Sequence, residues 1–456
     1  MKKILLAVFA LVLTAVWAAP SFAVDASFGA QYRVRAFYLD NWDDRDDDAM
    51  DQKSYVDNRF RLGITLKEAP VTGYVQLQIG GNKWWGAASA PDTSTTTANT
   101  PTDTSMSVVA RQGWLEFPVG PLGVKLGRTY SSSGFLGGGI AENISDRIHL
   151  SYKASNDLNL SATFAKPRES STGAVGTTGT VANDNDKESY NIGFRYKPQG
   201  AAFDLGAVVY YVRDGRDYYS ASGAATTGGS FDAFWLIADT NLKFDPINIY
   251  LSAALLNGES KSGGLVSPNV DMDLEGYAVH ADVSAKLGPA KIGVVGGLGS
   301  GDDNTADKSL KTFFAPSAAS YIQTHMFWQA GENAYSGAIG SGSLNTQNGS
   351  RETLSNITWG AVYADYNATD ALSLGAKYAV LRQTDSLSGT DNKIGNEIDL
   401  TLNYKIHKYL NLLAFAAWFD PDDGYSGKDS SGLSGHATTN KDDTMTAYYA
   451  RLQWEF

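Results

Sequence analysis

The chain ends on the stretch Thr444-Met-Thr-Ala-Tyr-Tyr-Ala-Arg-Leu-Gln-Trp-Glu-Phe456, in which apolar and polar residues alternate. Arg451, Gln453 and Glu455 share one face of this stretch. The opposite face is apolar and consists of Tyr448, Ala450, Leu452, Trp454 and Phe456. A period of two predicts a β-strand with one apolar and one polar face. A strand that runs to the last residue fits the closure of a membrane barrel, in which every backbone group needs a partner. An ordinary edge strand is the alternative.

The same stretch resembles the carboxy-terminal signal of bacterial outer-membrane proteins, in which a final Phe follows apolar residues at every second position. The resemblance implies a location in the bacterial outer membrane. We expect this closing strand to pair with the first strand of the mature chain, residues 28–38. That strand also alternates, with Gln31, Arg33 and Arg35 on its polar face.

The amino terminus is typical of a secretory signal peptide. Lys2 and Lys3 precede an apolar run over residues 4–17, and Ser21-Phe22-Ala23 forms a small-x-small cleavage site. A membrane anchor is the alternative, but this run of about 14 residues is shorter than the roughly 20 needed to span a bilayer. We therefore predict a signal peptide over residues 1–23 and one β-barrel domain over residues 24–456.

The composition favours a large β domain and gives no sign of nucleic-acid binding. The formal net charge is -12, and a strongly basic patch is missing from the sequence. Cysteine is absent, so an exported chain of this length would depend on a hydrogen-bonded framework in place of disulfides. Glycine, tyrosine and tryptophan number 47, 24 and 10, which suits the turns and aromatic girdles of a membrane barrel.

Connections of two kinds separate the segments that alternate with a period of two. Short turns such as Glu68-Ala69-Pro70 and Gly288-Pro289 contain residues that tight turns favour. Long polar loops include residues 81–106, 130–146 and 299–355. Short turns on one side and long loops on the other are typical of an up-and-down membrane barrel.

These patterns predict an all-β fold, a transmembrane antiparallel up-and-down β-barrel of eighteen strands. Sixteen strands is the fallback, because the segments around residues 108–117, 357–366 and 410–419 are apolar on both faces. A soluble sandwich or propeller is the competing architecture, but the sequence contains no repeat at a fixed period.

A glycine-rich segment, residues 131–146, follows the short strand Val124-Lys-Leu-Gly-Arg-Thr-Tyr130. At this point the chain resembles general bacterial porins, through Gly127-Arg128-Thr129-Tyr130 and the preceding Trp114-Leu115-Glu116-Phe117. The resemblance implies that this third loop folds into the barrel and narrows the channel, and that the protein forms a homotrimer. A loop that stays on the surface is the alternative.

Arginines recur on the polar faces of the strands near this segment. Placing an arginine on the lipid face costs on the order of 2–4 kcal/mol near the midplane, so we expect these side chains in the lumen. The predicted basic strip, with its neighbours on the strand after the loop, comprises Arg33, Arg35, Arg59, Arg61, Arg128, Arg147, His149 and Lys153. Glu142 and Asp146 of the loop, with Asp57, are the expected counter-charges. The strip either sets a field that filters ions or only pins the loop; both interpretations stay open.

Acidic loops are weak candidates for structural calcium, because closely spaced carboxylates suit a hard cation. The segment with Asp420, Asp422 and Asp423 is the clearest of them. Solvated loops that contact lipopolysaccharide are the favoured alternative, and no other cofactor is expected.

The sequence as a whole predicts an outer-membrane porin for passive diffusion of small hydrophilic solutes, with small anions favoured at an arginine-lined constriction. A substrate-specific carbohydrate or polyanion channel is the alternative, because Gly299-Ser-Gly-Asp302 and Gly395-Asn-Glu-Ile-Asp-Leu400 resemble parts of alginate-export barrels. An outer-membrane enzyme is disfavoured, since none of the five histidines belongs to a serine motif or a metal-spaced pair.

Overall fold

A computed structural model gives the conformation of most of the chain. The described residues are 24–40, 52–84, 108–133, 141–168, 186–214, 230–261, 271–302, 307–316, 324–325, 356–385, 392–422 and 444–456. The predicted signal peptide lies outside them. Within these ranges the structure has no helix that is long and apolar enough to cross a membrane.

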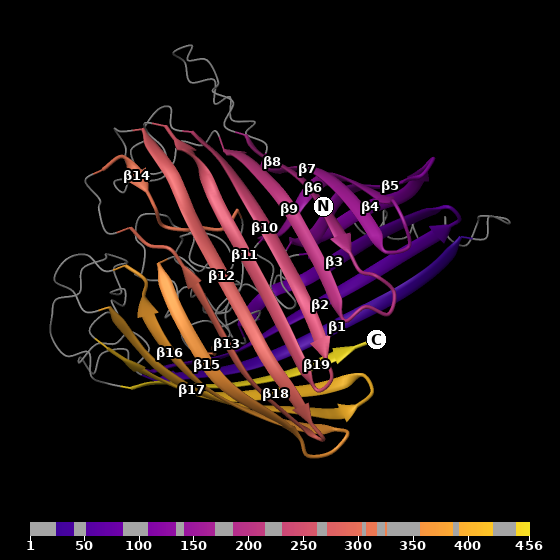
Figure 1. Cartoon of the computed structure of the whole chain (residues 1–456). Helices are drawn as coiled ribbons and strands as arrows, with labels where there is room; N and C mark the ends of the chain where they lie inside the picture. The colour runs from indigo at the N-terminus through magenta and orange to yellow at the C-terminus, as the bar shows by residue number, and fades with distance from the viewer. Residues whose placement is uncertain are drawn as a thin grey trace, which may run out of the picture.

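The described part of the chain forms eighteen long strands and one two-residue strand (Figure 1). They are β1 (Asp25–Asp40), β2 (Gln52–Glu68), β3 (Val71–Trp84), β4 (Val108–Val119), β5 (Leu122–Ser133), β6 (Ala141–Lys153), β7 (Leu158–Arg168), β8 (Lys187–Tyr196), β9 (Phe203–Asp214), β10 (Phe231–Phe244), β11 (Ile247–Ser260), β12 (Met272–Leu287), β13 (Ala290–Gly299), β14 (Ser309–Leu310), β15 (Ile357–Asn367), β16 (Leu372–Gln383), β17 (Lys393–His407), β18 (Leu410–Pro421) and β19 (Met445–Glu455).

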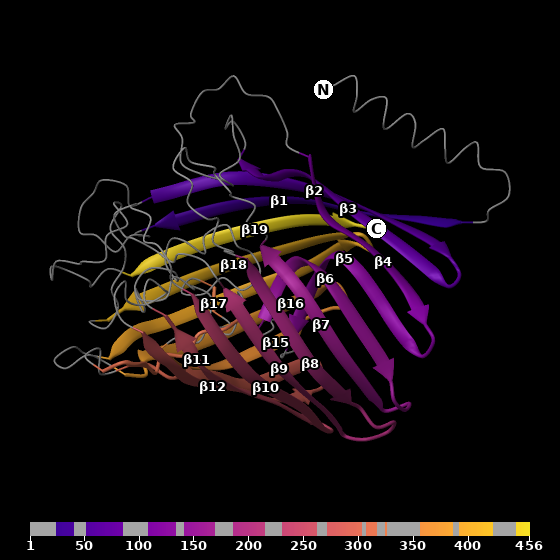
Figure 2. The ribbon, with the colours of Figure 1, turned by 90° about the horizontal axis from the view of Figure 1, so that it is seen from above.

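The strands close into an antiparallel barrel in which each long strand pairs with its neighbours in the sequence. The carboxy-terminal stretch makes the closure, since β19 lies between β1 and β18 (Figure 2). Trp454 pairs with Tyr32, and the Phe456 amide donates a hydrogen bond to the Ala30 carbonyl over 3.1 Å. The prediction of eighteen strands and of pairing between the two ends is confirmed. All three doubtful segments are strands, so the sixteen-strand fallback is wrong.

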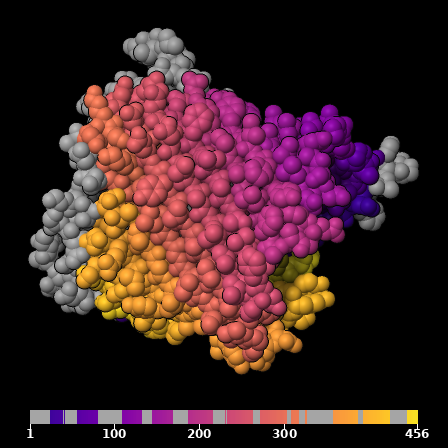
Figure 3. Space-filling model, in the orientation of Figure 1, coloured from indigo at the N-terminus to yellow at the C-terminus, as the bar shows by residue number. Residues whose placement is uncertain are grey.

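The alternation seen in the sequence separates the two faces of the barrel wall. On β12, Tyr277, Val279 and Val283 are exposed on the outer face, whereas His280 and Ser284 are buried on the inner face. Figure 3 shows the outer face as a surface packed with side chains across the strands coloured magenta to orange. An apolar outer face opposite polar inner side chains is expected of a membrane barrel, and elsewhere the inner face also carries buried apolar side chains such as Trp235 and Ile237.

Turns and loops gather at opposite ends of the barrel. At the short-turn end, Gly120 and Gly288 adopt positive φ values of 59° and 62°, which a residue with a Cβ atom rarely adopts. At the opposite end, here called the long-loop end, most connections lie outside the described residues. The strand bounds leave two residues between β2 and β3 but 23 between β3 and β4, so the predicted difference in length between the two sets of connections is confirmed.

The predicted third loop is mostly barrel wall. β5 and β6 pair without interruption up to Ser133 and Ala141, so residues 131–133 and 141–146 form strand ladders. The prediction that these residues fold inward is wrong, and only residues 134–140, which lie outside the described residues, connect the two strands. The glycines of residues 131–146 all lie within this short connection, residues 134–140.

A different segment folds against the inner wall. We call residues 307–316 and 324–325, which follow β13, the inserted segment. The inward-facing indole of Trp235 on β10 donates a hydrogen bond to the Phe314 carbonyl over 2.7 Å, and the two rings lie 5.7 Å apart. On β12 a Cβ atom at Gly276 would lie 2.8 Å from the Cα atom of Phe313, so the close approach requires glycine.

The far end of the inserted segment contacts another part of the wall. The His325 amide donates to Glu397 Oε1 over 2.7 Å, and its ring Nε2 lies 2.9 Å from the Thr401 hydroxyl, both on β17. The imidazole also stacks on Phe415 of β18 at 4.2 Å. The described contacts of this segment therefore extend from β10 to β18 around the lumen.

Candidate functional site

The four arginines predicted on the first two strands face the lumen together. Arg33 lies directly opposite Arg59, and Arg35 lies one pair nearer the long-loop end. Tyr32, which has the opposite parity, is exposed on the outer face, whereas Arg33 and Arg35 are buried. The sequence prediction that these side chains share the inner wall agrees with this placement.

Arg35 is bound tightly to a carboxylate of the neighbouring strand. Its Nε donates to Asp57 Oδ1 over 2.9 Å and its Nη2 to Oδ2 over 2.5 Å. The two side chains are 1% and 0% exposed. A bidentate pair in such a position fixes both side chains, because leaving either charge buried alone would cost several kcal/mol. The pinning interpretation from the sequence therefore suits Arg35.

Arg59 and Arg61 instead use neutral acceptors. Arg59 Nη2 donates to Gln31 Oε1 and Arg61 Nε to Gln78 Oε1, each over 2.8 Å. An amide oxygen satisfies a donor without cancelling its charge. These two guanidinium groups therefore keep their positive charge on the inner wall.

Two further arginines belong to the same wall but were missed from the sequence. Arg111 on β4 donates to Gln76 Oε1 over 3.0 Å, and Arg451 on β19 lies directly opposite Arg35. Arg451 was visible as part of the polar face of the closing strand. Arg111 lies at a register shift of the β3–β4 ladder, which the sequence does not reveal.

We call this set the arginine wall: Arg33, Arg35, Arg59, Arg61, Arg111 and Arg451, with Asp57. Glu455 lies next to it, where its Oε2 accepts a hydrogen bond from Gln31. Among the described residues of this wall, six arginines and two carboxylates leave an excess of four positive charges.

Arg147, His149 and Lys153 also face the lumen, but from β6. Arg147 Nη2 donates to Ser145 Oγ over 2.8 Å, and His149 Nδ1 lies 2.9 Å from the Thr163 hydroxyl. Four strand spacings separate β2 from β6, which is about 19 Å along the wall. The structure therefore does not bring these three residues into the arginine wall.

Two predicted lumen residues lie on the outer face. Arg128 pairs directly with Asp146, and their side chains form an ion pair of 3.1 Å in which they are 50% and 63% exposed. Ile148, with the same parity as Asp146, is also exposed on that face. The prediction of a lumen position is wrong for both. Arg128 lies two residues after Leu126 and Asp146 two residues before Ile148, so both side chains share the outer face with these apolar residues. The side chain of Glu142 lies outside the described residues.

The structure places the histidine of the inserted segment and part of the predicted calcium site. Burial, with a smaller contribution from Lys377, lowers the pKa of His325 in the inserted segment to about 3, so its imidazole is neutral. Among the described residues, no group of three His, Cys, Asp or Glu side chains is placed to hold a metal ion. Asp420 and Asp422 lie at the end of β18, and Asp423, the third predicted calcium ligand, lies outside the described residues.

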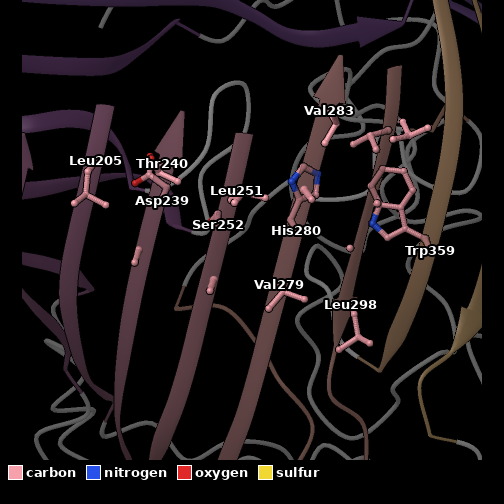
Figure 4. A pocket seen from close by; sticks show the side chains of 17 residues that line it. Leu205, Asp239, Thr240, Leu251, Ser252, Val279, His280, Val283, Leu298 and Trp359 are labelled. Atoms are coloured by element: carbon pink, nitrogen blue, oxygen red, sulfur yellow. The ribbon is translucent and has the colours of Figure 1, made fainter. Parts of the chain in front are cut away.

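A pocket in the wall of β9 to β15 has a different character (Figure 4). Its outer side chains are apolar, among them Leu251, Val279 and Leu298, whereas His280 and Trp359 point to the lumen side. The rings of His280 and Trp359 lie 6.0 Å apart across Gly297. With a largely apolar lining, this pocket belongs to the membrane-facing surface, and we assign it no solute.

The barrel is similar to solved structures from Pseudomonas aeruginosa. OccK9 (OpdG) shares 14% identity, with 95% of this chain and 99% of that chain covered and a TM-score of 0.55. OccK2 (OpdF), solved in complex with glucuronate, shares 12% identity over 95% and 98% of the two chains, with a TM-score of 0.55. The outer membrane protein OpdK shares 10% identity over 95% and 98%, with a TM-score of 0.52.

No protein-family model and no curated protein matches this chain. The structural similarity shows the fold, which is that of bacterial outer-membrane porins. At 10–14% identity it transfers no solute and no binding residue.

Proposed function

We propose that the protein is an outer-membrane porin through which small hydrophilic solutes and ions diffuse passively, with small anions favoured at the arginine wall. The protein performs no covalent chemistry in this proposal. The fold of the neighbouring porins supports the channel, and the wall residues support its preference for anions.

The excess of positive charge on one side of the lumen is the observation that carries the proposal. Inside a narrow channel with low-dielectric walls, uncancelled charges act on passing ions more strongly than they would in bulk water. Arg59 and Arg61 bind neutral amides, so their charge remains available to an anion. The formal net charge of -12 belongs to the whole chain and acts mainly on ions approaching from outside.

The remaining parts of the proposal concern the surroundings. We expect export through a cleaved signal peptide over residues 1–23, insertion in the outer membrane and contact with lipopolysaccharide. We also propose a homotrimer, by resemblance to general porins.

Reversal potentials in planar bilayers test the ion preference. With purified protein under a tenfold potassium chloride gradient, we expect the reversal potential to have the sign of chloride preference. Strong preference for potassium would contradict the role given to the arginine wall. Absence of conductance from folded protein would contradict the channel itself.

A substrate-specific channel is the second candidate function. The solved neighbour in complex with glucuronate favours it, because that solute combines a carboxylate with several hydroxyl groups. Saturable block of the current by such a solute would support a specific channel, and a purely linear effect on conductance would support general diffusion.

A further inference from the structure

The lumen contains a second polar region, away from the arginine wall. A cavity of about 490 Å³ lies against β5 to β10. We call it the hydroxyl cavity, because its polar lining includes Thr129, Ser131, Ser151, Asn159, Ser161, Thr163 and Asn191. Its volume falls within the range of sites that hold small molecules, about 300–1,000 Å³.

The register of the strands aligns part of this lining in one row. Lys125, His149, Thr163, Asn191 and Tyr210 lie directly opposite one another on five consecutive strands. Directly opposite side chains on one face are close neighbours, with Cβ atoms about 5 Å apart. The row therefore presents several polar groups at a spacing that suits successive hydroxyl groups of one molecule.

The row contains groups that both donate and accept hydrogen bonds, and Lys125, which only donates. His149 Nδ1 is already bound to the Thr163 hydroxyl over 2.9 Å. Asn191, only 9% exposed, lines the cavity, and its side-chain amide makes no hydrogen bond to a described residue. Such a buried amide needs a partner, and one that lines a cavity is available to a solute or to water.

The charges around the cavity cancel, in contrast to the arginine wall. Lys125 Nζ forms an ion pair with Glu116 Oε2 at 2.8 Å. Arg195 bridges Asp204 and Asp239, and its pair with Asp239 Oδ2 measures 2.5 Å. Gly206 leaves the space for this contact, since a Cβ atom there would lie 2.7 Å from Arg195 Nη1. The cations of the lining are Lys125, Arg147 and Arg195, and the three carboxylates are Asp239 in the lining and Glu116 and Asp204, which pair with Lys125 and Arg195.

We propose that the hydroxyl cavity binds uncharged polyhydroxylated solutes, such as sugars and sugar alcohols. Hydrogen bonds from paired donors and acceptors suit hydroxyl groups, each of which can donate and accept. A balanced set of charges gives no advantage to an anion, which the arginine wall would attract instead. This inference rests on the proposed channel function and adds to it a second site with a different class of ligand.

Current block by two uncharged probes tests the inference. We expect glucose to block the open channel with saturation, and triethylene glycol, which lacks a dense set of donors, to reduce the current without saturation. The isosteric variants Thr163→Val and Asn191→Leu should each raise the half-blocking glucose concentration by about three- to tenfold, because each removes hydrogen bonds to the solute. Asn403→Leu, the same substitution on the inner face of β17, is the matched control and should leave the block unchanged.

The possible failures are distinguishable. No conductance from folded protein would contradict the channel function. Conductance with normal anion preference but no saturable glucose block would overturn this inference alone. Block by glucuronate without block by glucose would also overturn it, because charge would then select the solute. Heat-modifiable electrophoresis confirms that each variant folds; if Asn191→Leu does not, the smaller change Thr163→Val carries the test.

Discussion

The arginine wall and the hydroxyl cavity line the same lumen with opposite electrostatic designs. On β2, Arg59 and Arg61 donate hydrogen bonds to glutamine side chains, which are neutral, so both guanidinium groups keep their positive charge. Around the cavity, Lys125 and Arg195 pair with carboxylates, which satisfy their hydrogen bonds and also neutralise their charge. The choice of acceptor, amide or carboxylate, therefore decides whether a lumen cation acts on solutes or only on the wall.

The arginine wall and the hydroxyl cavity would select solutes by different properties. An excess of charge acts over several ångströms and distinguishes ions by sign. A balanced set of donors and acceptors acts only in direct contact and distinguishes solutes by the placement of hydroxyl groups. Substitutions in the arginine wall should therefore leave solute binding at the hydroxyl cavity unchanged, and substitutions in the cavity should leave the ion preference unchanged.

The largest expected effect comes from the buried ion pair between Arg35 and Asp57 in the arginine wall. Asp57→Asn would leave Arg35 buried without its carboxylate, at a cost of about 3–5 kcal/mol in the free energy of unfolding. Urea denaturation in detergent, followed by the loss of heat-modifiable mobility, measures this change. Glu259→Gln is the control, because it breaks an exposed ion pair with Lys261 next to the end of β11, and exposed pairs contribute little to stability. Equal effects of the two substitutions would contradict the account.

Reversing the charges that bind amides should reverse the ion preference. The double variant Arg59→Glu and Arg61→Glu changes four unit charges in the lumen, and we expect the anion-to-cation permeability ratio to fall about a hundredfold after screening by salt. Reversal potentials measure the ratio. Arg128→Glu on the outer face should leave it unchanged, and a similar shift there would show that position in the lumen does not matter.

Acid should loosen the inserted segment at its contact with β17. The pKa of His325 is about 3 when the segment is inserted and about 6.5 when the ring is in water. The released form therefore binds a proton more readily than the inserted form. The stabilisation of the inserted form by this group is fully present above pH 6.5 and is lost as the pH falls towards 3. At pH 5 the loss from this group is about 2 kcal/mol.

The measurement is single-channel conductance between pH 7 and pH 5, with larger or noisier openings expected at pH 5. The charged groups that face or adjoin the imidazole are Glu397, Asp399 and Lys377, and the Thr401 hydroxyl lies 2.9 Å from its Nε2. His325→Gln removes the histidine contribution alone. A profile identical to that of the unaltered protein would contradict the assignment.

The smallest expected effect concerns the contact of the inserted segment with β10. Trp235→Phe keeps a ring beside Phe314 but removes the indole hydrogen bond to its carbonyl, worth about 1 kcal/mol. We expect slightly more frequent conductance fluctuations in bilayer recordings, with ion preference unchanged. Phe234→Leu, which points outward from the same strand, is the control; fluctuations that rise equally in both variants would argue against the anchor.

The barrel could be predicted from the sequence because its strongest signal is periodic. The alternation in β1 and in β6 separates the side chains of each strand into two faces, and Arg33, Arg35 and Arg147 lie on the faces that the structure buries. The same parity, applied from Leu126 and Ile148, would have placed Arg128 and Asp146 outside. The loop-entry motif and the alternation of the strand conflict at this point, and the paired strands follow the alternation.

The identity of the inserted segment could not be predicted in this way. Its position depends on contacts between residues far apart in the chain, such as Trp235 with Phe314 and His325 with Glu397. The space left by Gly276 and the β-bulge beside Arg111 are likewise properties of the paired strands. Sequence spacing carries no information about such contacts.

The central claim is that the arginine wall and the hydroxyl cavity act independently, and one set of bilayer recordings tests it most directly. Reversal potential and glucose block would be measured together on the unaltered protein, on Arg59→Gln and on Asn191→Leu. The account predicts that Arg59→Gln lowers anion preference and leaves glucose block intact, whereas Asn191→Leu weakens glucose block and leaves anion preference intact. Both variants changing both properties, or an unaltered channel that strongly prefers cations, would contradict it.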